Sequence, residues 1–138
     1  MKYVLLHPII NNKQINTMAA KKFLTKSELQ VMLILWSLPT KGGYTNEILA
    51  GYEDPKPAYT TLATFLKILT NKGFVKSQKV GSMLYFTPQV SRADYCKRVM
   101  EKAQKDYFEG DGAKFIQFLI RQNNLSDEEK QAIIATLG

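Results

Sequence analysis

The sequence predicts a mainly α-helical protein with one small β-hairpin, organised as a winged helix-turn-helix DNA-binding domain followed by a helical dimerisation segment. Three observations carry this prediction. An amphipathic helical pattern spans residues 58–71, two short strand patterns follow it, and three further helical patterns occupy the remaining chain. We therefore expect a mobile N-terminal arm over residues 1–22, a winged-helix domain over residues 23–90 and a dimerisation region over residues 91–138.

Charge is divided unevenly along this chain of 138 residues, whose formal net charge is +7. Residues 1–90 contain eleven lysines and four acidic residues, whereas residues 91–138 contain eight basic and eight acidic residues. The excess positive charge therefore lies in the half with the helix and hairpin patterns, as expected of a nucleic-acid-binding half joined to a neutral one. Many proteins are mildly basic without binding nucleic acid. The uneven charge distribution therefore supports nucleic-acid binding only in combination with the helix and hairpin motifs.

Several functional classes are disfavoured by what the sequence lacks. One cysteine, Cys96, and one histidine, His7, give neither an internal disulfide nor the four ligands of a structural zinc site. No nucleophile-base pair, paired carboxylates or glycine-rich phosphate loop indicates an enzyme, and we expect no cofactor. The apolar runs are too short to span a membrane, and the start lacks a signal-peptide pattern, so we expect a cytoplasmic protein without membrane insertion. Residues 1–17 are either a mobile arm or precede the true initiator, Met18.

The first clear helix begins with a capping box, in which Thr25 and Glu28 satisfy each other's backbone amides. Its buried stripe is predicted to be Leu29, Met32, Leu33 and Trp36, widened by Val31, Ile34 and Leu35. Pro39 with Gly42-Gly43 ends the helix. A short second helix is expected from about Thr45 to Tyr52, with Thr45 as its N-cap.

A stiff proline-containing turn over residues 53–57 then leads into the helix at 58–71, which Lys72-Gly73 ends with a cation and a glycine. Two helices joined by a short turn, the second with a polar outer face, have the order of a helix-turn-helix. The apolar stripe of the second helix comprises Leu62, Phe65, Leu66 and Leu69.

The opposite face of this helix carries threonine, asparagine and lysine side chains that can hydrogen-bond base edges, and methyl groups that can touch thymine. An ordinary surface helix can have the same wet face, so only the flanking elements favour DNA binding. We expect the base-reading residues to be Thr60, Thr61, Ala63 and Thr64.

Two strands are predicted at residues 74–80 and 83–87, around a turn at Gly81-Ser82. Val75, Leu84 and Phe86 are expected to face inward, and lysine, serine and glutamine side chains form a cationic rim. In a winged helix such a rim lies along the phosphate backbone and positions the protein. The expected phosphate-binding residues are Tyr59, Lys67, Lys72, Lys76, Lys79 and Ser82.

Three more helices are predicted after Pro88, the last opened by a second capping box, Ser126 with Glu129. They are too few and too short to bury their own apolar side chains in a monomer. We therefore expect a homodimer, as is usual for DNA-binding proteins that recognise two half-sites. The expected dimerisation residues are Tyr95, Val99, Phe115, Ile116, Phe118, Leu119, Ile133, Ile134 and Leu137.

In their order and spacing these motifs resemble the penicillinase repressor family, the BlaI/MecI group of bacterial winged-helix repressors, over about residues 23–137. The residues that carry the resemblance are Leu24, Thr25, Glu28, Val31, Met32, Leu35, Trp36, Tyr59, Thr60, Thr61, Thr64, Leu66, Leu69, Lys72 to Val75, and Leu125 to Glu129. The resemblance implies a homodimer on a double-stranded DNA operator that represses a resistance operon.

The resemblance also implies induction by a membrane metalloprotease sensor that leads to cutting of the C-terminal part. In the best-known members the cut falls at an Asn-Phe bond, whereas the corresponding helix here reads KFIQFLIRQNN and has none. The copper-sensing branch carries a C-terminal cysteine cluster, which this sequence lacks.

A second hypothesis is a winged-helix module used for protein-protein assembly without an operator of its own. The feature that favours it is the modest charge of the polar helix, in which Lys67 is the only cation away from the ends.

Overall fold

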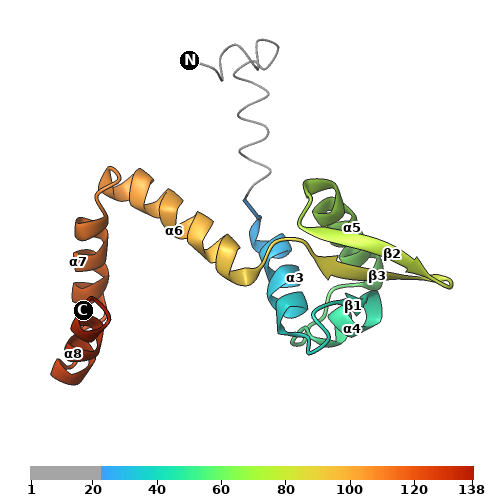
Figure 1. Cartoon of the computed structure of the whole chain (residues 1–138). Coiled ribbons are helices and arrows are strands. Elements are labelled where there is room, and N and C mark those ends of the chain that lie inside the picture. Colours follow the sequence, from blue (N-terminus) through green and yellow to red (C-terminus); the bar gives the residue numbers. More distant parts are fainter. Residues whose placement is uncertain (1–22) are drawn as a thin grey trace, which may run out of the picture. The chain divides into compact units, whose positions relative to one another are not determined.

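The computed structural model describes residues 23–138, so the expectations for the arm over residues 1–22, for His7 and for a start at Met18 lie outside the described residues. The chain divides between Tyr95 and Cys96 into two compact units, slightly later than the boundary expected after residue 90. The first unit contains α3 (Lys26–Ser37), β1 (Gly43–Tyr44), α4 (Thr45–Ala50), α5 (Tyr59–Lys72), β2 (Val75–Val80) and β3 (Met83–Pro88) (Figure 1). The fold class predicted from the sequence is confirmed: helices predominate, and the sheet is a small antiparallel one.

The predicted capping box of α3 is present. Val31, Met32 and Leu35 are buried as expected, but the buried stripe is centred differently from the predicted one. The Thr25 hydroxyl accepts a hydrogen bond from the Glu28 amide, and the Glu28 carboxylate accepts one from the Thr25 amide. The buried residues are Glu28, Val31, Met32 and Leu35, whereas Leu33 is 42% exposed. The observed stripe has the same i, i+3, i+4, i+7 spacing but begins one residue earlier, because α3 turns the charged Glu28 inward rather than Leu29.

A two-residue strand that the sequence did not reveal precedes α4. β1 pairs with β3 in antiparallel register, Gly43 with Phe86 and Tyr44 with Tyr85, and gives a three-stranded sheet of order β1-β3-β2. A Cβ atom on Gly42 would lie 2.7 Å from the Tyr85 hydroxyl, so the glycine permits this close approach. Tyr44 is therefore the N-cap of α4, and the expectation that Thr45 caps this helix was wrong.

α5 and the hairpin match their predicted positions closely. Leu62, Leu66 and Leu69 are fully buried, and Gly73 ends the helix in the left-handed conformation with φ of +83°. β2 and β3 pair in antiparallel register around Gly81-Ser82, with Ser77 opposite Phe86 and Val80 opposite Met83.

The core of the first unit extends to the beginning of α6 (Arg92–Phe108) and includes Tyr95, which is 6% exposed. The Tyr95 ring lies 5.6 Å from that of Phe74 and 6.2 Å from that of Trp36, measured between centroids, and its hydroxyl accepts a hydrogen bond from the Leu24 amide. The assignment of Tyr95 to a dimer interface is therefore corrected, because the side chain is already buried within one chain.

The second unit contains the rest of α6, α7 (Gly112–Gln122) and α8 (Asp127–Ala135). The predicted Ser126-Glu129 capping box is present, and Asp111 caps α7 by accepting a hydrogen bond from the Lys114 amide. Phe108 contacts Phe115 and Phe118, with ring centroids 5.2 and 5.3 Å away. Neither α7 nor α8 has a buried residue. Within residues 23–138 no helix combines the length and apolar character that a membrane crossing requires.

Candidate nucleic-acid interface

The outer face of α5 presents the predicted base-reading side chains together. Thr60, Thr61, Ala63 and Thr64 are all exposed, and Leu62, Leu66 and Leu69 hold the other side of the helix against the core. Lys67, one turn after Ala63, is also exposed. Because the helix is anchored along three successive turns, its outer face is a rigid surface rather than a mobile loop.

Thr64 presents only part of its hydrogen-bonding capacity to the outside. Its hydroxyl donates a hydrogen bond of 3.0 Å to the Thr60 carbonyl oxygen within α5. The oxygen lone pairs and the methyl group therefore face the solvent. These groups can accept from an adenine or cytosine amino group, or touch a thymine methyl, but they do not offer a donor to guanine.

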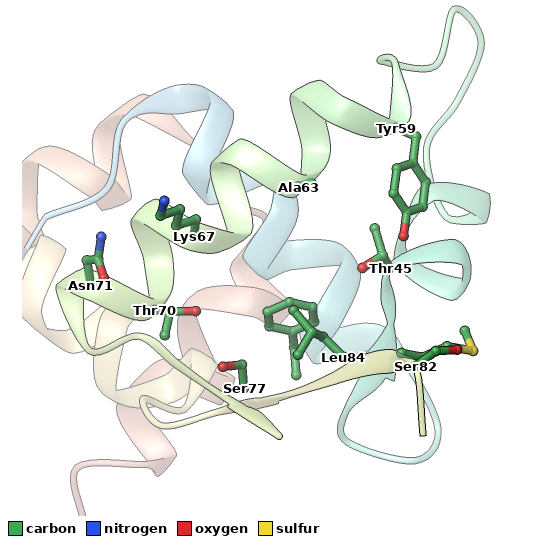
Figure 2. A pocket seen from close by; sticks show the side chains of 11 residues that line it. Thr45, Tyr59, Ala63, Lys67, Thr70, Asn71, Ser77, Ser82 and Leu84 are labelled. Carbon is green, nitrogen blue, oxygen red and sulfur yellow. The ribbon is translucent and has the colours of Figure 1, made fainter. Parts of the chain in front are cut away.

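A pocket of about 400 Å³ lies between α5 and the hairpin, and we call it the α5-wing pocket (Figure 2). Its lining comes from α4, from the polar side of α5 and from both strands of the wing, and none of these described lining residues is acidic. The lining residues are Thr45, Tyr59, Ala63, Lys67, Thr70, Asn71, Ser77, Ser82, Met83, Leu84 and Phe86. A volume in this range, with a few convergent polar groups, is typical of binding clefts.

The two wing lysines lie on opposite faces of the hairpin. Val75 and Phe86, which are 2% and 4% exposed, define the face turned toward the core. Alternation along β2 places Lys79 on this inner face and Lys76 on the other. Leu84 shares the inner face but is 47% exposed because it borders the open α5-wing pocket, so it is not buried as expected.

Lys72 does not belong to the exposed cations. Its ammonium group lies 2.6 Å from the Glu28 carboxylate, and its side chain is 19% exposed. It also donates to the Phe23 carbonyl oxygen at 3.4 Å. The assignment of Lys72 to phosphate binding is therefore corrected, because the charge is already paired inside the domain.

The environment of Glu28 favours its ionised form. Burial alone would raise the pKa, but the hydrogen bond from Lys72, the amide of Thr25, the positive charge of Lys72 and the hydroxyl of Thr25 together outweigh it. The pKa of Glu28 accordingly lies below its ordinary value of 4.5.

Thr45 and Thr70 are among the pocket residues that were not predicted as site residues. The sequence offered Thr45 only as a helix cap, and Thr70 lies on the margin of the apolar stripe of α5. Their place at the pocket depends on the pairing of β1 with β3 and on the fold of the wing over α5, which no local pattern reveals.

A helix-turn-helix whose second helix is followed by an antiparallel wing, with a polar outer helix face beside it, defines the winged-helix class of DNA-binding proteins. Comparison with protein families matches residues 24–138 to the family described as penicillinase repressor. The chain therefore belongs to the penicillinase repressor family, whose members are DNA-binding transcriptional repressors and not enzymes. The resemblance noted in the sequence is confirmed.

Among solved structures, the chain is similar to a solution structure of the DNA binding domain of the repressor BlaI. The two are 27% identical, with 52% of this chain and 87% of that chain covered and a TM-score of 0.46. A comparison with curated proteins gave no match.

Proposed function

We propose that this repressor acts as a homodimer on a specific promoter operator of a resistance or membrane-peptidase-linked operon. The observation that carries the proposal is the outer face of α5, where Thr60, Thr61, Ala63 and Thr64 are exposed beside the α5-wing pocket. Small polar side chains and methyl groups at this position suit the floor of a major groove. Tyr59, Lys67 and Ser82 line the α5-wing pocket beside this surface, and Lys79 lies on the inner face of the wing; these four side chains suit the phosphates of the groove.

The homodimer is supported by apolar side chains that the second unit leaves uncovered. Ile116, Phe118 and Ile134 are 56%, 45% and 57% exposed, and Leu137 is 81% exposed. Apolar groups that are exposed together mark an interaction surface, and a second copy of the chain would cover them. The proposed interface comprises Val99, Phe115, Ile116, Phe118, Leu119, Ile133, Ile134 and Leu137.

Family membership extends the proposal to induction by a membrane metalloprotease sensor. Because α7 and its C-terminal turn have no Asn-Phe bond, a cut in this chain would fall at a different bond. Mass spectrometry of the repressor recovered from induced cells would give that bond. An intact chain after full derepression would exclude cleavage and indicate release by a ligand.

Protein-protein assembly without an operator is the second candidate, and the wing favours it. Val80, Met83 and Leu84 are 45%, 43% and 47% exposed, which makes the wing tip apolar. A gel shift on the protein's own upstream promoter, with a random duplex as competitor, separates the two functions. A retarded band that survives excess competitor supports the operator. Binding lost equally with either duplex supports assembly.

A further inference from the structure

Thr45 is a buried polar residue whose hydroxyl has no role inside the domain. The residue is only 8% exposed, and no hydrogen bond of its hydroxyl is present among residues 23–138. The hydroxyl oxygen is nevertheless accessible, because the described side-chain oxygen that is sealed from solvent without a partner is that of Tyr52. It lines the α5-wing pocket, and Figure 2 shows it beside the hydroxyl end of Tyr59, whose ring extends toward it from the start of α5. A hydroxyl that opens onto a pocket and makes no bond within the described domain is available to donate a hydrogen bond to a ligand in that pocket.

The position of the α5-wing pocket indicates which ligand it receives. One wall of the pocket is α5, whose outer face carries the proposed base readers, and the opposite wall is the wing. In duplex DNA each groove is walled by sugar-phosphate strands. A duplex that receives α5 in its major groove and is touched by the wing must therefore pass one such strand between them, through the α5-wing pocket.

The chemistry of the lining agrees with a phosphodiester. Thr45 and Tyr59 supply hydroxyl donors, and Lys67 supplies one cation. No carboxylate lies among the described lining residues to repel an anion. Leu84 and Ala63 supply apolar surface, which suits the carbon face of a deoxyribose rather than a second charge.

We propose that the Thr45 hydroxyl donates a hydrogen bond to one phosphate of the DNA strand that passes between α5 and the wing. This inference rests on the proposed function, since it requires α5 to enter the major groove. Thr45 is then a positioning residue: it fixes the depth and register of α5 without reading a base itself.

The test compares Thr45→Val, which keeps the shape of the side chain and removes its hydroxyl, with wild type on an operator duplex and on a random duplex. We expect affinity to fall about tenfold on both duplexes, because a hydrogen bond to a charged group is lost. The ratio of the two affinities and the slope of log K against log salt should not change, since a neutral hydroxyl releases no counterion. Thr45→Ser should restore wild-type binding.

Thr87→Val is the matched control, because Thr87 is exposed on the hairpin face that also carries Lys76, away from the pocket. Thermal unfolding checks the fold of each variant, and Thr45→Ala replaces Thr45→Val if valine is not tolerated. A duplex with a single neutral methylphosphonate at the contacted phosphate should weaken wild type but not Thr45→Val. Wild-type affinity of folded Thr45→Val and Thr45→Ala would overturn the inference. Loss of operator preference in wild type would instead overturn the proposed function.

Discussion

The Lys72 ammonium at the end of α5 lies 2.6 Å from the Glu28 carboxylate in the first turn of α3. Glu28 also accepts a hydrogen bond from the Thr25 amide at 3.0 Å, so one carboxylate caps α3 and holds the C-terminal end of α5. The apolar stripe already holds α5 against the core, but it does not prevent the helix from sliding along its own axis. The ion pair restrains that motion by fixing the position of the C-terminal end of α5. The pair thus connects the stability of the domain to the placement of its DNA-binding face.

Replacing Glu28 by glutamine should lower the free energy of unfolding by about 2 kcal/mol, because a charged hydrogen bond in a nearly buried site becomes a neutral one. Chemical denaturation of wild type and variant measures the difference. Glu47→Gln is the matched control, since Glu47 caps α4 by accepting from the Tyr44 amide but is exposed. Equal losses for the two variants would mean that the ion pair contributes nothing beyond the cap.

The same carboxylate predicts a pH dependence. The pKa of Glu28 is lowered in the folded state, so its contribution is complete above the ordinary value of 4.5 and is lost as the pH falls through the folded pKa. Stability measured by thermal unfolding should therefore fall more steeply below pH 4.5 in wild type than in Glu28→Gln. Parallel curves for the two proteins across that range would exclude Glu28 as the source.

The two faces of the wing predict different roles for its lysines. Lys79 shares the inner face of the hairpin with Ser77, and Ser77 lines the α5-wing pocket, whereas Lys76 is on the opposite face. Lys79→Ala should reduce the slope of log K against log salt by about one unit, because one phosphate contact is lost. Lys76→Ala, which removes the same charge, should change the slope little. Equal slopes for Lys79→Ala and wild type would exclude the contact.

Thr64 should contribute to sequence discrimination rather than to overall affinity. Its hydroxyl proton is engaged by the Thr60 carbonyl, so Thr64→Ser, which removes the exposed methyl, should relax preference at one base pair by roughly 1–3 kcal/mol. Competition with single-base operator variants measures the preference, and Thr64→Val tests the oxygen separately. If Thr64→Ser weakened every operator variant by one factor, Thr64 would not read a base.

The parts of this fold that could be predicted from the sequence are those set by local patterns. The stripe of α5, its stop at Gly73 and the hairpin around Gly81 each follow from a few neighbouring residues. The inward turn of Glu28 could not be foreseen, because its partner Lys72 lies 44 residues away in the chain. β1 was missed for the same reason: a two-residue strand has no periodicity, and only its partner β3 defines it.

The residues of the candidate site likewise fall into those that a local pattern predicts and those that depend on contacts between distant segments. The exposed threonines of α5 could be named because a helix face follows from spacing alone. The burial of Tyr95 and the position of Thr45 at the pocket depend on contacts between distant segments, so the sequence assigned one to a dimer interface and the other to a helix cap.

Dimerisation should depend on the apolar face of α7. Ile116 is 56% exposed in the single chain, so Ile116→Lys should leave the fold of the monomer intact while placing a charge in the proposed interface. We expect sedimentation to change from dimer to monomer, because burying an unpaired charge in an interface is strongly unfavourable. Gln117→Lys adds the same charge to the next exposed residue of α7 and serves as the control.

The DNA-binding consequence separates the dimer from the individual winged helix. A dimer binds two half-sites at once, and the second contact gains from the high effective concentration that the first provides. Ile116→Lys should therefore lose affinity for a full operator while its affinity for a single half-site stays at the wild-type level. If Ile116→Lys remained dimeric, the dimer interface would lie elsewhere than on the apolar face of α7. If wild type were monomeric, the homodimer would be excluded. In either case the apolar face of α7 would need a different partner.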